Sequence, residues 1–296
     1  MDVVKTRNIW FILSSLVLLA GVISLAVFGL NLGIDFKGGT LLEVKFLENK
    51  PEITALEELT TEISTGNTVV QRLGENSFSI RTVELSPEQH DTLNSRLIEQ
   101  YGQIEERLFN KIGPVLSREI TKRAGYQLVL VIFGILVYIA WAFRRVPKPL
   151  SSWRFGWAAI VALIHDLLVV IGVFAVLGRF LNVEINALFV TALLTVLGFS
   201  VHDTIIVFDR IRENLRRLAH ARFEEIINRS INQTLVRSIN TSTTVIFVLI
   251  ALLLFGGESI RYFTLALLVG IVAGTYSSIF LATPLLYVSH RKRFSR

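Results

Sequence analysis

Six apolar stretches dominate this chain, and each is long enough to cross a membrane as a helix. They cover residues 9–28, 124–143, 155–177, 187–208, 238–255 and 262–288. Crossing about 30 Å of hydrocarbon takes roughly 20 residues of helix, and lipid offers no hydrogen-bond partner to other backbone conformations. The sequence therefore predicts a polytopic α-helical membrane protein with six transmembrane helices. The first is read as an uncleaved helix, because its apolar core is longer than that of a signal peptide.

Composition narrows the class further. Hydrophobic residues make up 52% of the chain and charged residues 18%, and cysteine is absent. This charged fraction is low for a soluble domain, and without cysteine there is no disulfide scaffold, thiolate metal site or cysteine nucleophile. The net charge of +6 arises beside the apolar stretches, whereas residues 30–125 are net acidic. We therefore expect membrane lipid, and no nucleic acid, as a partner.

The distribution of Lys and Arg in the connections predicts the orientation. Basic residues precede the first stretch, follow the last, and join the second to the third and the fourth to the fifth. The opposite side offers only Arg179 and Arg261. By the positive-inside rule, both termini are cytoplasmic. Residues 1–29 then form helix one, residues 30–123 an external domain, and residues 124–296 helices two to six.

The external segment has a pattern of its own. Alternation predicts strands over 41–46, 68–73, 77–82 and 104–109, and helical spacing predicts a helix over 53–64. A second helix runs through residue 101, with Ser86 as N-cap and Pro87 at its first position. The order β-α-β-β-α-β is typical of a ferredoxin-like α+β domain. Because the segment lacks a phosphate loop, clustered metal ligands and a Ser/His/Asp set, we expect a contact module, with no catalytic residue, metal or cofactor.

Residues 209–236 form a basic segment between the fourth and fifth stretches. Its apolar residues recur at helical spacing opposite the arginines: Leu215, Leu218, Phe223, Ile226, Ile227, Ile231 and Leu235. This pattern favours a helix lying in the cytoplasmic interface of the membrane. A solvated loop is the alternative, and it explains the arginines but not the apolar stripe.

Ionisable residues within the apolar stretches are few. An Asp at the centre of a membrane helix costs about 2.5–3.5 kcal/mol on insertion scales, so each such residue needs a partner, water or a function. Asp166 lies in the third stretch, Asp203 in the fourth, and Arg237 opens the fifth. Helical spacing places polar residues on one face around each of the last two: Ser200 and Thr204 with Asp203, and Asn240, Thr241 and Thr244 with Arg237. We expect the acidic and basic faces to oppose each other.

Such an arrangement predicts a proton relay through Asp203, Arg237 and Asp166. Low dielectric favours the neutral form of a carboxyl group, and a nearby guanidinium favours the ionised form. The alternatives are a static ion pair for Asp203 and structural hydrogen bonds for Asp166. His165 and His202 are candidate proton carriers or metal ligands. Because the two His-Asp pairs lie on different helices without a third ligand, we expect no metal site.

Small residues in the apolar stretches predict close approach of helices. They are Gly21 and Gly29, Gly198, and the G-x-x-x-G pair of Gly270 and Gly274. We interpret them as tight packing rather than as a functional motif.

Four strings in the chain resemble one family. They are GIDFKGGT at 33–40, IGP at 112–114, VHDTIIVFDRIREN at 201–214 and RSINTS at 237–242. They are similar to the SecD/SecF family of protein-export membrane proteins, within the resistance-nodulation-division superfamily. The resemblance covers the whole chain, including six spans and one large domain after the first.

The resemblance implies a half-unit that forms a heterodimer with a SecD-like subunit in a bacterial cell (inner) membrane, with the external domain in the periplasm. The pair would assist the SecYEG channel and use the proton gradient to draw a translocating polypeptide outward. The proton-path residues of the family fall on Asp203 and Arg237 here. Gly33, Asp35, Gly38 and Gly39 would form the base and hinge that joins helix one to the external domain. Lys37 and His202 depart from the smaller or neutral residues expected at their positions.

Two other classes remain open from the residues alone. An intramembrane aspartyl protease also has aspartates in neighbouring spans, but its second Asp normally follows a Gly-x-Gly pattern, and here residues 198–203 read GFSVHD. Inhibition by transition-state peptide analogues would favour it. A self-contained small-molecule exporter would pump without a second subunit.

Overall fold

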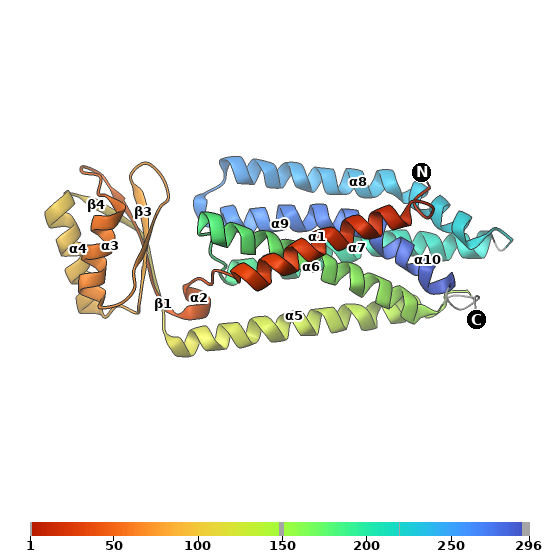
Figure 1. Cartoon of the computed structure of the whole chain (residues 1–296), viewed down its shortest axis with the longest axis horizontal. Helices are drawn as coiled ribbons and strands as arrows, with labels where there is room; N and C mark the ends of the chain where they lie inside the picture. The colour runs from red at the N-terminus through yellow and green to blue at the C-terminus, as the bar shows by residue number, and fades with distance from the viewer. Residues whose placement is uncertain (1, 148–150, 219, 292–296) are drawn as a thin grey trace. The chain divides into compact units, whose positions relative to one another are not determined.

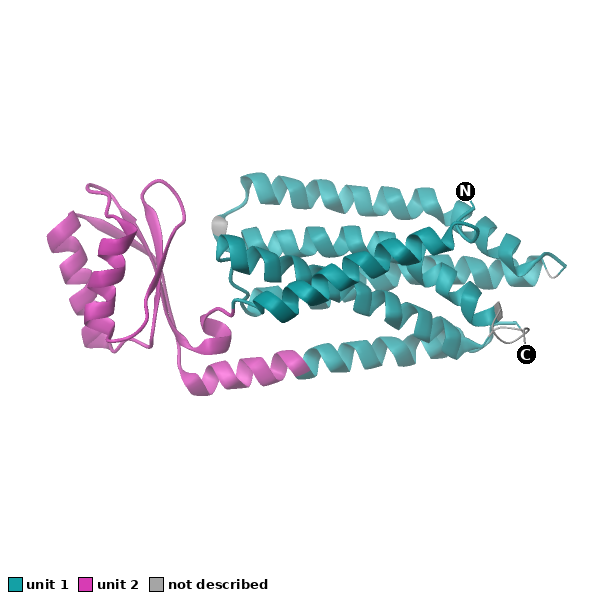
Figure 2. Ribbon diagram, in the orientation of Figure 1, with its two compact units in different colours: residues 1–31, 126–296 teal, residues 32–125 magenta. Residues whose placement is uncertain are grey.

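The computed structural model describes residues 2–147, 151–218 and 220–291. The chain divides into two compact units, which Figure 2 distinguishes by colour. One comprises residues 1–31 with 126–296, and the other comprises residues 32–125.

Long apolar helices build the first unit (Figure 1). They are α1 (Arg7–Phe28), α5 (Pro114–Ala142, of which residues 114–125 belong to the second unit), α6 (Ser152–Leu181), α7 (Ala187–Arg217), α8 (Phe223–Phe255) and α9 (Glu258–Ser277), which a π-turn (Ser278–Ala282) joins to α10 (Thr283–Arg291). Among the described residues, 6 helical stretches are long and apolar enough to cross a membrane. The prediction of six spans is confirmed, although α5 begins ten residues before the apolar stretch that predicted it.

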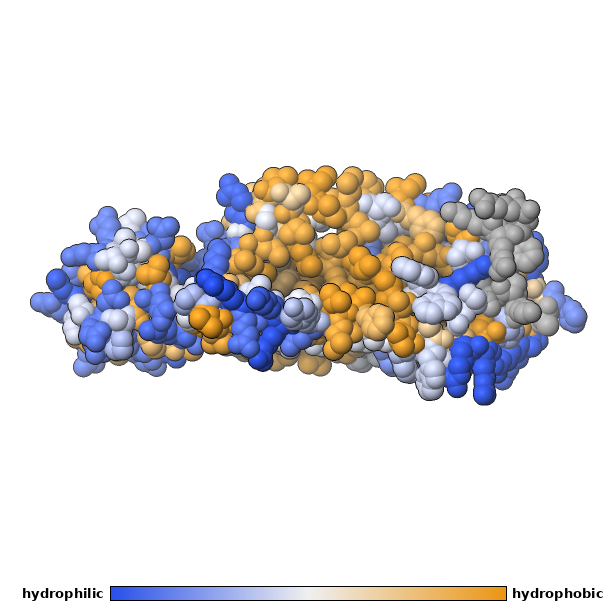
Figure 3. All heavy atoms as spheres, turned by 90° about the horizontal axis from the view of Figure 1, so that it is seen from below, coloured by the Kyte–Doolittle hydropathy of each residue, from blue (hydrophilic) through white to orange (hydrophobic). Residues whose placement is uncertain are grey.

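The helices differ in how far the protein itself buries them. In their most apolar windows, 56% of the residues of α6 and 61% of those in the last span are buried, against 6% in α1 and in α5. Figure 3 shows hydrophobic side chains over much of the face of this unit. An apolar surface on this scale is what lipid, or another membrane protein, covers.

Residues 209–236 are not one interfacial helix, so that prediction is wrong. The segment consists of the last turns of α7, a short connection and the first turns of α8. Its apolar residues Ile211, Ile227 and Ile231 are fully buried in one core cluster with Phe155 and Phe208. The apolar residues of the segment do recur at helical spacing, as predicted. The face that they form packs against neighbouring helices instead of lipid.

The glycines of the membrane unit divide into two groups. A Cβ on Gly172 would lie 2.5 Å from the Cα of Gly21, and one on Gly270 would lie 2.2 Å from a methyl of Val196. Close approach is therefore confirmed at Gly21 and Gly270. The prediction of close approach is wrong at Gly29 and Gly198, where a Cβ would meet nothing within 4 Å.

The second unit is a four-stranded antiparallel sheet with two longer helices, one short helix and the first residues of α5. A short helix α2 (Ile34–Lys37) precedes β1 (Gly39–Phe46), α3 (Ile53–Ser64), β2 (Val69–Arg72), β3 (Ser77–Thr82), α4 (Pro87–Tyr101) and β4 (Ile104–Ile112). The strand order is β2-β3-β1-β4. Inward residues of β1 and β3, such as Leu42, Val44 and Phe78, pack with Leu56 of α3 and Leu93 of α4.

Local sequence explains why these elements begin where they do. Ser86 accepts a hydrogen bond from the backbone of Gln89, whose side chain accepts one from the backbone of Ser86, and Pro87 follows. This capping box satisfies two backbone donors at the start of α4, which confirms the predicted N-cap.

Candidate functional site

Asp166 lies at the centre of the membrane unit and is fully buried on α6. Its Oδ1 lies 3.0 Å from Nδ1 of His165. Its Oδ2 accepts hydrogen bonds from Ser200 Oγ of α7 at 2.6 Å and from Ser277 Oγ of α9 at 2.8 Å. Three donors around one carboxylate compensate much of the cost of burying its charge.

Asp203, on α7, is 1% exposed and has a poorer set of partners. Its Oδ2 accepts one hydrogen bond, from Ser242 Oγ of α8 at 3.3 Å, and Ser242 in turn accepts one from Thr275 Oγ1 at 2.6 Å. Within the described part of the chain, Oδ1 of Asp203 has no hydrogen-bond partner. Nδ1 of His202 lies 3.9 Å from Oδ1, on a side chain that is 62% exposed. A buried carboxyl oxygen without a donor is a place where a proton can bind.

Further hydroxyl groups lie beside the Asp166 site. Thr204 Oγ1 lies 2.8 Å from Ser278 Oγ, and Ser278 donates to the backbone oxygen of Ser200, the residue that binds Asp166. The π-turn starts at Ser278, directly after Ser277. π-Turns within long helices often occur at functional sites. Here Ser277 reaches Asp166 while its neighbour Ser278 reaches Thr204 on α7.

The acidic half of the predicted site is confirmed in its geometry. Asp166, Asp203, Ser200 and Thr204 are each at most 1% exposed. Their spacing along α7 does place Ser200, Asp203 and Thr204 on one buried face. Their role in proton transfer stays a prediction.

The basic half lies elsewhere, and the prediction that the two faces oppose each other is wrong. Arg237, Asn240 and Thr244 are exposed and Thr241 is half-buried. The face of α8 that turns into the unit carries Ser238 and Ser242 instead. Adjacent helical residues point about 100° apart, so the predicted stripe has the correct period but is rotated by one position.

The prediction missed several hydroxyls around the aspartates, among them Ser277, which donates to Asp166, and Ser242, which donates to Asp203. Thr275, Ser277 and Ser278 belong to the run Thr275-Tyr276-Ser277-Ser278 in an apolar stretch without a charge. Ser238 and Ser242 are four residues apart on α8. Polar runs of this kind within a span are the available signal, because lipid gives such side chains no partner.

The glycine motif of the second unit has the backbone that only glycine tolerates. Gly33 caps α2, and Asp35 lies in its first turn. Gly38 has φ +80° and Gly39 has φ +129°, and a Cβ on Gly39 would lie 2.5 Å from the backbone oxygen of Thr82. The backbone angles at Gly38 and Gly39 explain why glycine is needed there. That these residues act as a hinge stays a prediction.

The placement of the carboxyl and imidazole groups bears on the metal and protease alternatives. Among the described residues, no group of three or more His, Cys, Asp or Glu side chains is placed to hold a metal ion. Asp166 and Asp203 each bind hydroxyls of their own, and in the part of the chain that the structure describes they share no hydrogen bond. A protease would need the two carboxyl groups to act on one substrate bond.

Six apolar helices with buried carboxyl groups and hydroxyls between them define a multi-pass membrane protein of the transport type. The comparisons with known families agree with this class. The family described as "Protein export membrane protein SecD/SecF, C-terminal" matches residues 93–292, and the "SecD/SecF GG Motif" matches residues 23–46. The chain belongs to the SecD/SecF family.

Relatives are similar over the full chain. A "Protein translocase subunit SecF" of Thermobaculum terrenum is 48% identical, with 100% of this chain and 96% of the relative covered. One from Anaerolinea thermophila is 38% identical, with 97% and 94% covered. The crystal structure of SecDF from Thermus thermophilus, titled a translocon-associated membrane protein, has a TM-score of 0.85 at 32% identity. It covers 98% of this chain, which spans 39% of that longer one.

Proposed function

We propose that the chain is a subunit of the Sec protein-export machinery that uses the proton motive force. It forms a heterodimer with a SecD-like subunit and promotes the movement of a translocating polypeptide through the SecYEG channel. Its membership of the SecD/SecF family and its likeness to SecF translocase subunits support the export role. The single observation that carries the proton role is the buried Oδ1 of Asp203, which has no hydrogen-bond partner among the described residues.

Asp203 is the proton-binding group of this proposal. In its neutral form the carboxyl group needs few donors, which fits the one long hydrogen bond from Ser242. In its ionised form it needs more. Ser238 lies one turn from Ser242 on the same face of α8, and its buried hydroxyl has no partner among the described residues. Loss of the proton would therefore favour a shift of α8 that brings a second hydroxyl to Asp203, which couples charge to helix position.

Asp166 is the fixed end of the relay. Its three donors hold its charge in place, and two of them come from α7 and α9. Because Ser200 lies one turn before Asp203, a change at Asp203 moves the same face of α7 that binds Asp166. We infer that Asp166 keeps this face in register while the proton is exchanged.

Arg237 acts through the partner subunit rather than through a direct ion pair with Asp203. It lies on an exposed face of α8 between Val236 and Ile239, which are 66% and 47% exposed. A guanidinium facing hydrocarbon is costly, and such a group almost always faces protein or water. Only 6% of the apolar window of α5 and 17% of that of α8 is buried. A second six-helix subunit would cover these helices and pair the charge.

The orientation completes the proposal. Both termini lie in the cytoplasm, and residues 32–125 form an external ferredoxin-like module that contacts the polypeptide or the channel. Within the membrane unit, the backbone of Val4 donates to Asn228 at the start of α8, so the N-terminal segment lies at the same end as the arginine-rich connection. The positive-inside rule assigns that end to the cytoplasm. No cofactor is required.

The test replaces Asp203 by Asn, which has the shape of the neutral carboxyl group but binds no proton. Export into inverted membrane vesicles is measured with and without a protonophore, per assembled complex. Asp203→Asn should lower export to the level seen with the protonophore and make it insensitive to the gradient. The control is Asp209→Asn, the same change on α7 at a carboxyl group that is 55% exposed, which should retain stimulation. Normal gradient-dependent export by Asp203→Asn would exclude the proton role and leave the export role standing.

A further inference from the structure

His202 lies at the surface of α7, beside the carboxyl group of Asp203. Its side chain is 62% exposed, and its Nδ1 lies 3.9 Å from Oδ1 of Asp203. That oxygen is closed to solvent and has no hydrogen-bond partner among the described residues. Because water does not touch Oδ1, a proton needs a side chain that meets the surface on one side and the carboxyl group on the other. His202 has this placement.

The exposed face of α7 around His202 lacks large apolar side chains. Between residues 190 and 210, the exposed positions of this helix are Thr191, Thr195, Gly198, His202 and Asp209. They follow one another at steps of three, four or seven residues, so they share one face. On α1, by contrast, most exposed residues are large and apolar, such as Ile12, Leu16 and Leu19. A face that carries an imidazole and no large apolar group suits water or a polar partner rather than hydrocarbon.

Few other charged groups lie at this level of the membrane unit. α7 packs against α6, α8 and α9. Of these helices, α6 carries His165 and Asp166 at mid-span, α8 carries Arg237 on an exposed face, and α9 carries no charged residue after Arg261. The ion pair recorded for His202 is with Asp203. Asp203 is therefore the base that His202 is placed to protonate.

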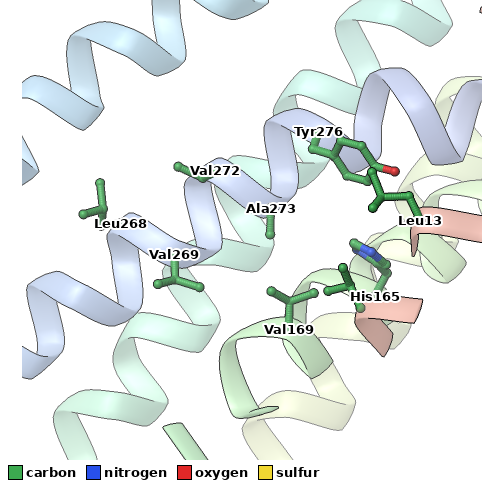
Figure 4. A pocket seen from close by; sticks show the side chains of 9 residues that line it. Leu13, His165, Val169, Leu268, Val269, Val272, Ala273 and Tyr276 are labelled. Carbon is green, nitrogen blue, oxygen red and sulfur yellow. The ribbon is translucent and has the colours of Figure 1, made fainter. Parts of the chain in front are cut away.

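The histidine beside the other aspartate is placed differently. His165 lies next to an almost entirely apolar cavity between α1, α6 and α9, where Figure 4 shows it near Leu13 and Tyr276. It is 2% exposed, and its Nδ1 already contacts Asp166 at 3.0 Å. The pair of His165 and Asp166 is thus closed, whereas His202 joins the buried carboxyl group of Asp203 to the surface.

We propose that His202 is the proton donor of Asp203. Protonated His202 gives the hydrogen on Nδ1 to Oδ1, so that the Nδ1–H bond breaks, an Oδ1–H bond forms and both side chains become neutral. The exposed ring then takes up the next proton from water. The distance of 3.9 Å is longer than a hydrogen bond, and a turn of the ring toward Oδ1 closes it, because such contacts often tighten only during the reaction. The inference rests on the proposed function, since it supplies the proton that Asp203 binds there.

A hydroxyl route to the other oxygen of Asp203 is the alternative. Ser242 donates to Oδ2 at 3.3 Å and accepts from Thr275 Oγ1 at 2.6 Å. Thr275 Oγ1 also donates to the backbone oxygen of Ile271 at 2.9 Å, so this chain of hydroxyls ends within α9. The variant Ser242→Ala interrupts this route and leaves His202 in place.

The test measures the gradient-dependent part of export into inverted membrane vesicles, per assembled complex. His202→Ala should slow it about tenfold to 100-fold, since proton transfer by a positioned side chain is commonly worth at least that much. His202→Gln keeps a polar side chain that binds no proton, and it should be equally slow. His220→Ala is the matched control at an exposed histidine outside the spans, and it should retain export. Normal export by His202→Ala or His202→Gln would overturn the proposal, and loss in Ser242→Ala alone would place the route at Oδ2.

Added imidazole separates proton donation from a structural role of the ring. Imidazole should restore gradient-dependent export to His202→Ala, because it fits the space of the lost ring and exchanges protons near neutral pH. Pyrazole has the same shape but binds a proton only in strong acid, so it should restore nothing. The unchanged chain, measured with the same additions, corrects for any effect on the gradient itself. Equal restoration by both compounds, or none by imidazole, would overturn the proposal.

The same assay keeps this inference apart from the proposed function. Asp203→Asn combined with His202→Ala should not respond to imidazole, because the acceptor of the proton is gone. If Asp203→Asn alone retains gradient-dependent export, the proton role of Asp203 fails. If Asp203→Asn loses it and His202→Ala retains it, only the role of His202 fails.

Discussion

Gly274 on α9 meets Ser200 on α7 at the point where Ser200 donates to Asp166. A Cβ on Gly274 would lie 2.9 Å from Cβ and 3.3 Å from Cα of Ser200. The first distance is too short for carbon atoms, and neither atom is the free end of a flexible side chain. Gly274→Ala must therefore displace α7 or α9 locally and disturb the 2.6 Å hydrogen bond from Ser200 to Asp166.

The size of the effect follows from three contributions. Alanine favours the helix over glycine by about 1 kcal/mol. Overfilling a packed contact costs about 1–3 kcal/mol. A weakened hydrogen bond between membrane helices costs about 0.6 kcal/mol, and up to about 1.7. The net expectation for Gly274→Ala is a loss of about 1–3 kcal/mol in the free energy of unfolding.

The measurement is reversible unfolding of the purified chain in mixed detergent micelles, together with export per assembled complex. Gly198→Ala is the control, because Gly198 lies on α7 near the same contact and its Cβ would meet nothing within 4 Å. It should be neutral or stabilising by up to about 1 kcal/mol. Ser200→Ala removes only the hydroxyl and should cost less than Gly274→Ala. If Gly274→Ala is as stable and active as Gly198→Ala, the close contact does not position the Asp166 site.

Two further predictions concern the partner and the orientation. Arg237→Leu should abolish export and lower the amount of co-purified SecD-like subunit without changing the unfolding of the isolated chain, because Arg237 is exposed; Arg237→Lys keeps the charge but loses the planar donor group, so it should be partly active. Unfolding of the isolated chain that shifts by several kcal/mol would instead favour a buried ion pair. Reporter fusions at Glu75 and Arg179 should give the external signal and a fusion at Arg217 the cytoplasmic one, and a cytoplasmic signal at Glu75 would reverse the proposed topology.

Much of the second unit follows from local sequence. Helix 53–64 and strand 77–82 have the predicted boundaries, and α4 begins at the predicted cap. These elements have one apolar face that covers the core and one polar face toward water. The sequence therefore predicts both the type of element and the face that it buries. The membrane spans were equally predictable as spans, because length and apolarity alone define them.

The direction in which each membrane helix faces was harder to predict. Lipid is as apolar as the protein interior, so an apolar residue such as Val236 gives no sign of which side it faces. Arginine was therefore taken as the inward group of α8, whereas the structure buries the smaller Ser238 and Ser242. The hydroxyl groups around Asp166 were hard to predict for the same reason, because their contacts depend on which way each helix faces. Ser277 reaches Asp166 through the packing of α9 against α6 and α7.

The joint before β1 allows a test of mechanical coupling. Gly38 has φ +80° and ψ +166°, a region that is essentially restricted to glycine, and a Cβ there would lie 3.3 Å from the backbone oxygen of Ile112. A β-branched side chain in such a conformation costs of order 1–3 kcal/mol. Gly38→Val should therefore impair export. The control is Gly74→Val in the turn between β2 and β3, where a Cβ would meet nothing within 4 Å.

Two explanations of a defect at Gly38 differ in what else they change. If residues 32–125 must move on this joint during each proton cycle, Gly38→Val lowers export per assembled complex while the complex forms at a normal level. If Gly38 only permits a static turn, abundance and export fall together, because the strain acts on folding. Normal export per assembled complex would remove the reason to propose a hinge. Loss of export in a fully assembled complex would mean that the backbone freedom of this glycine is used during the transport cycle.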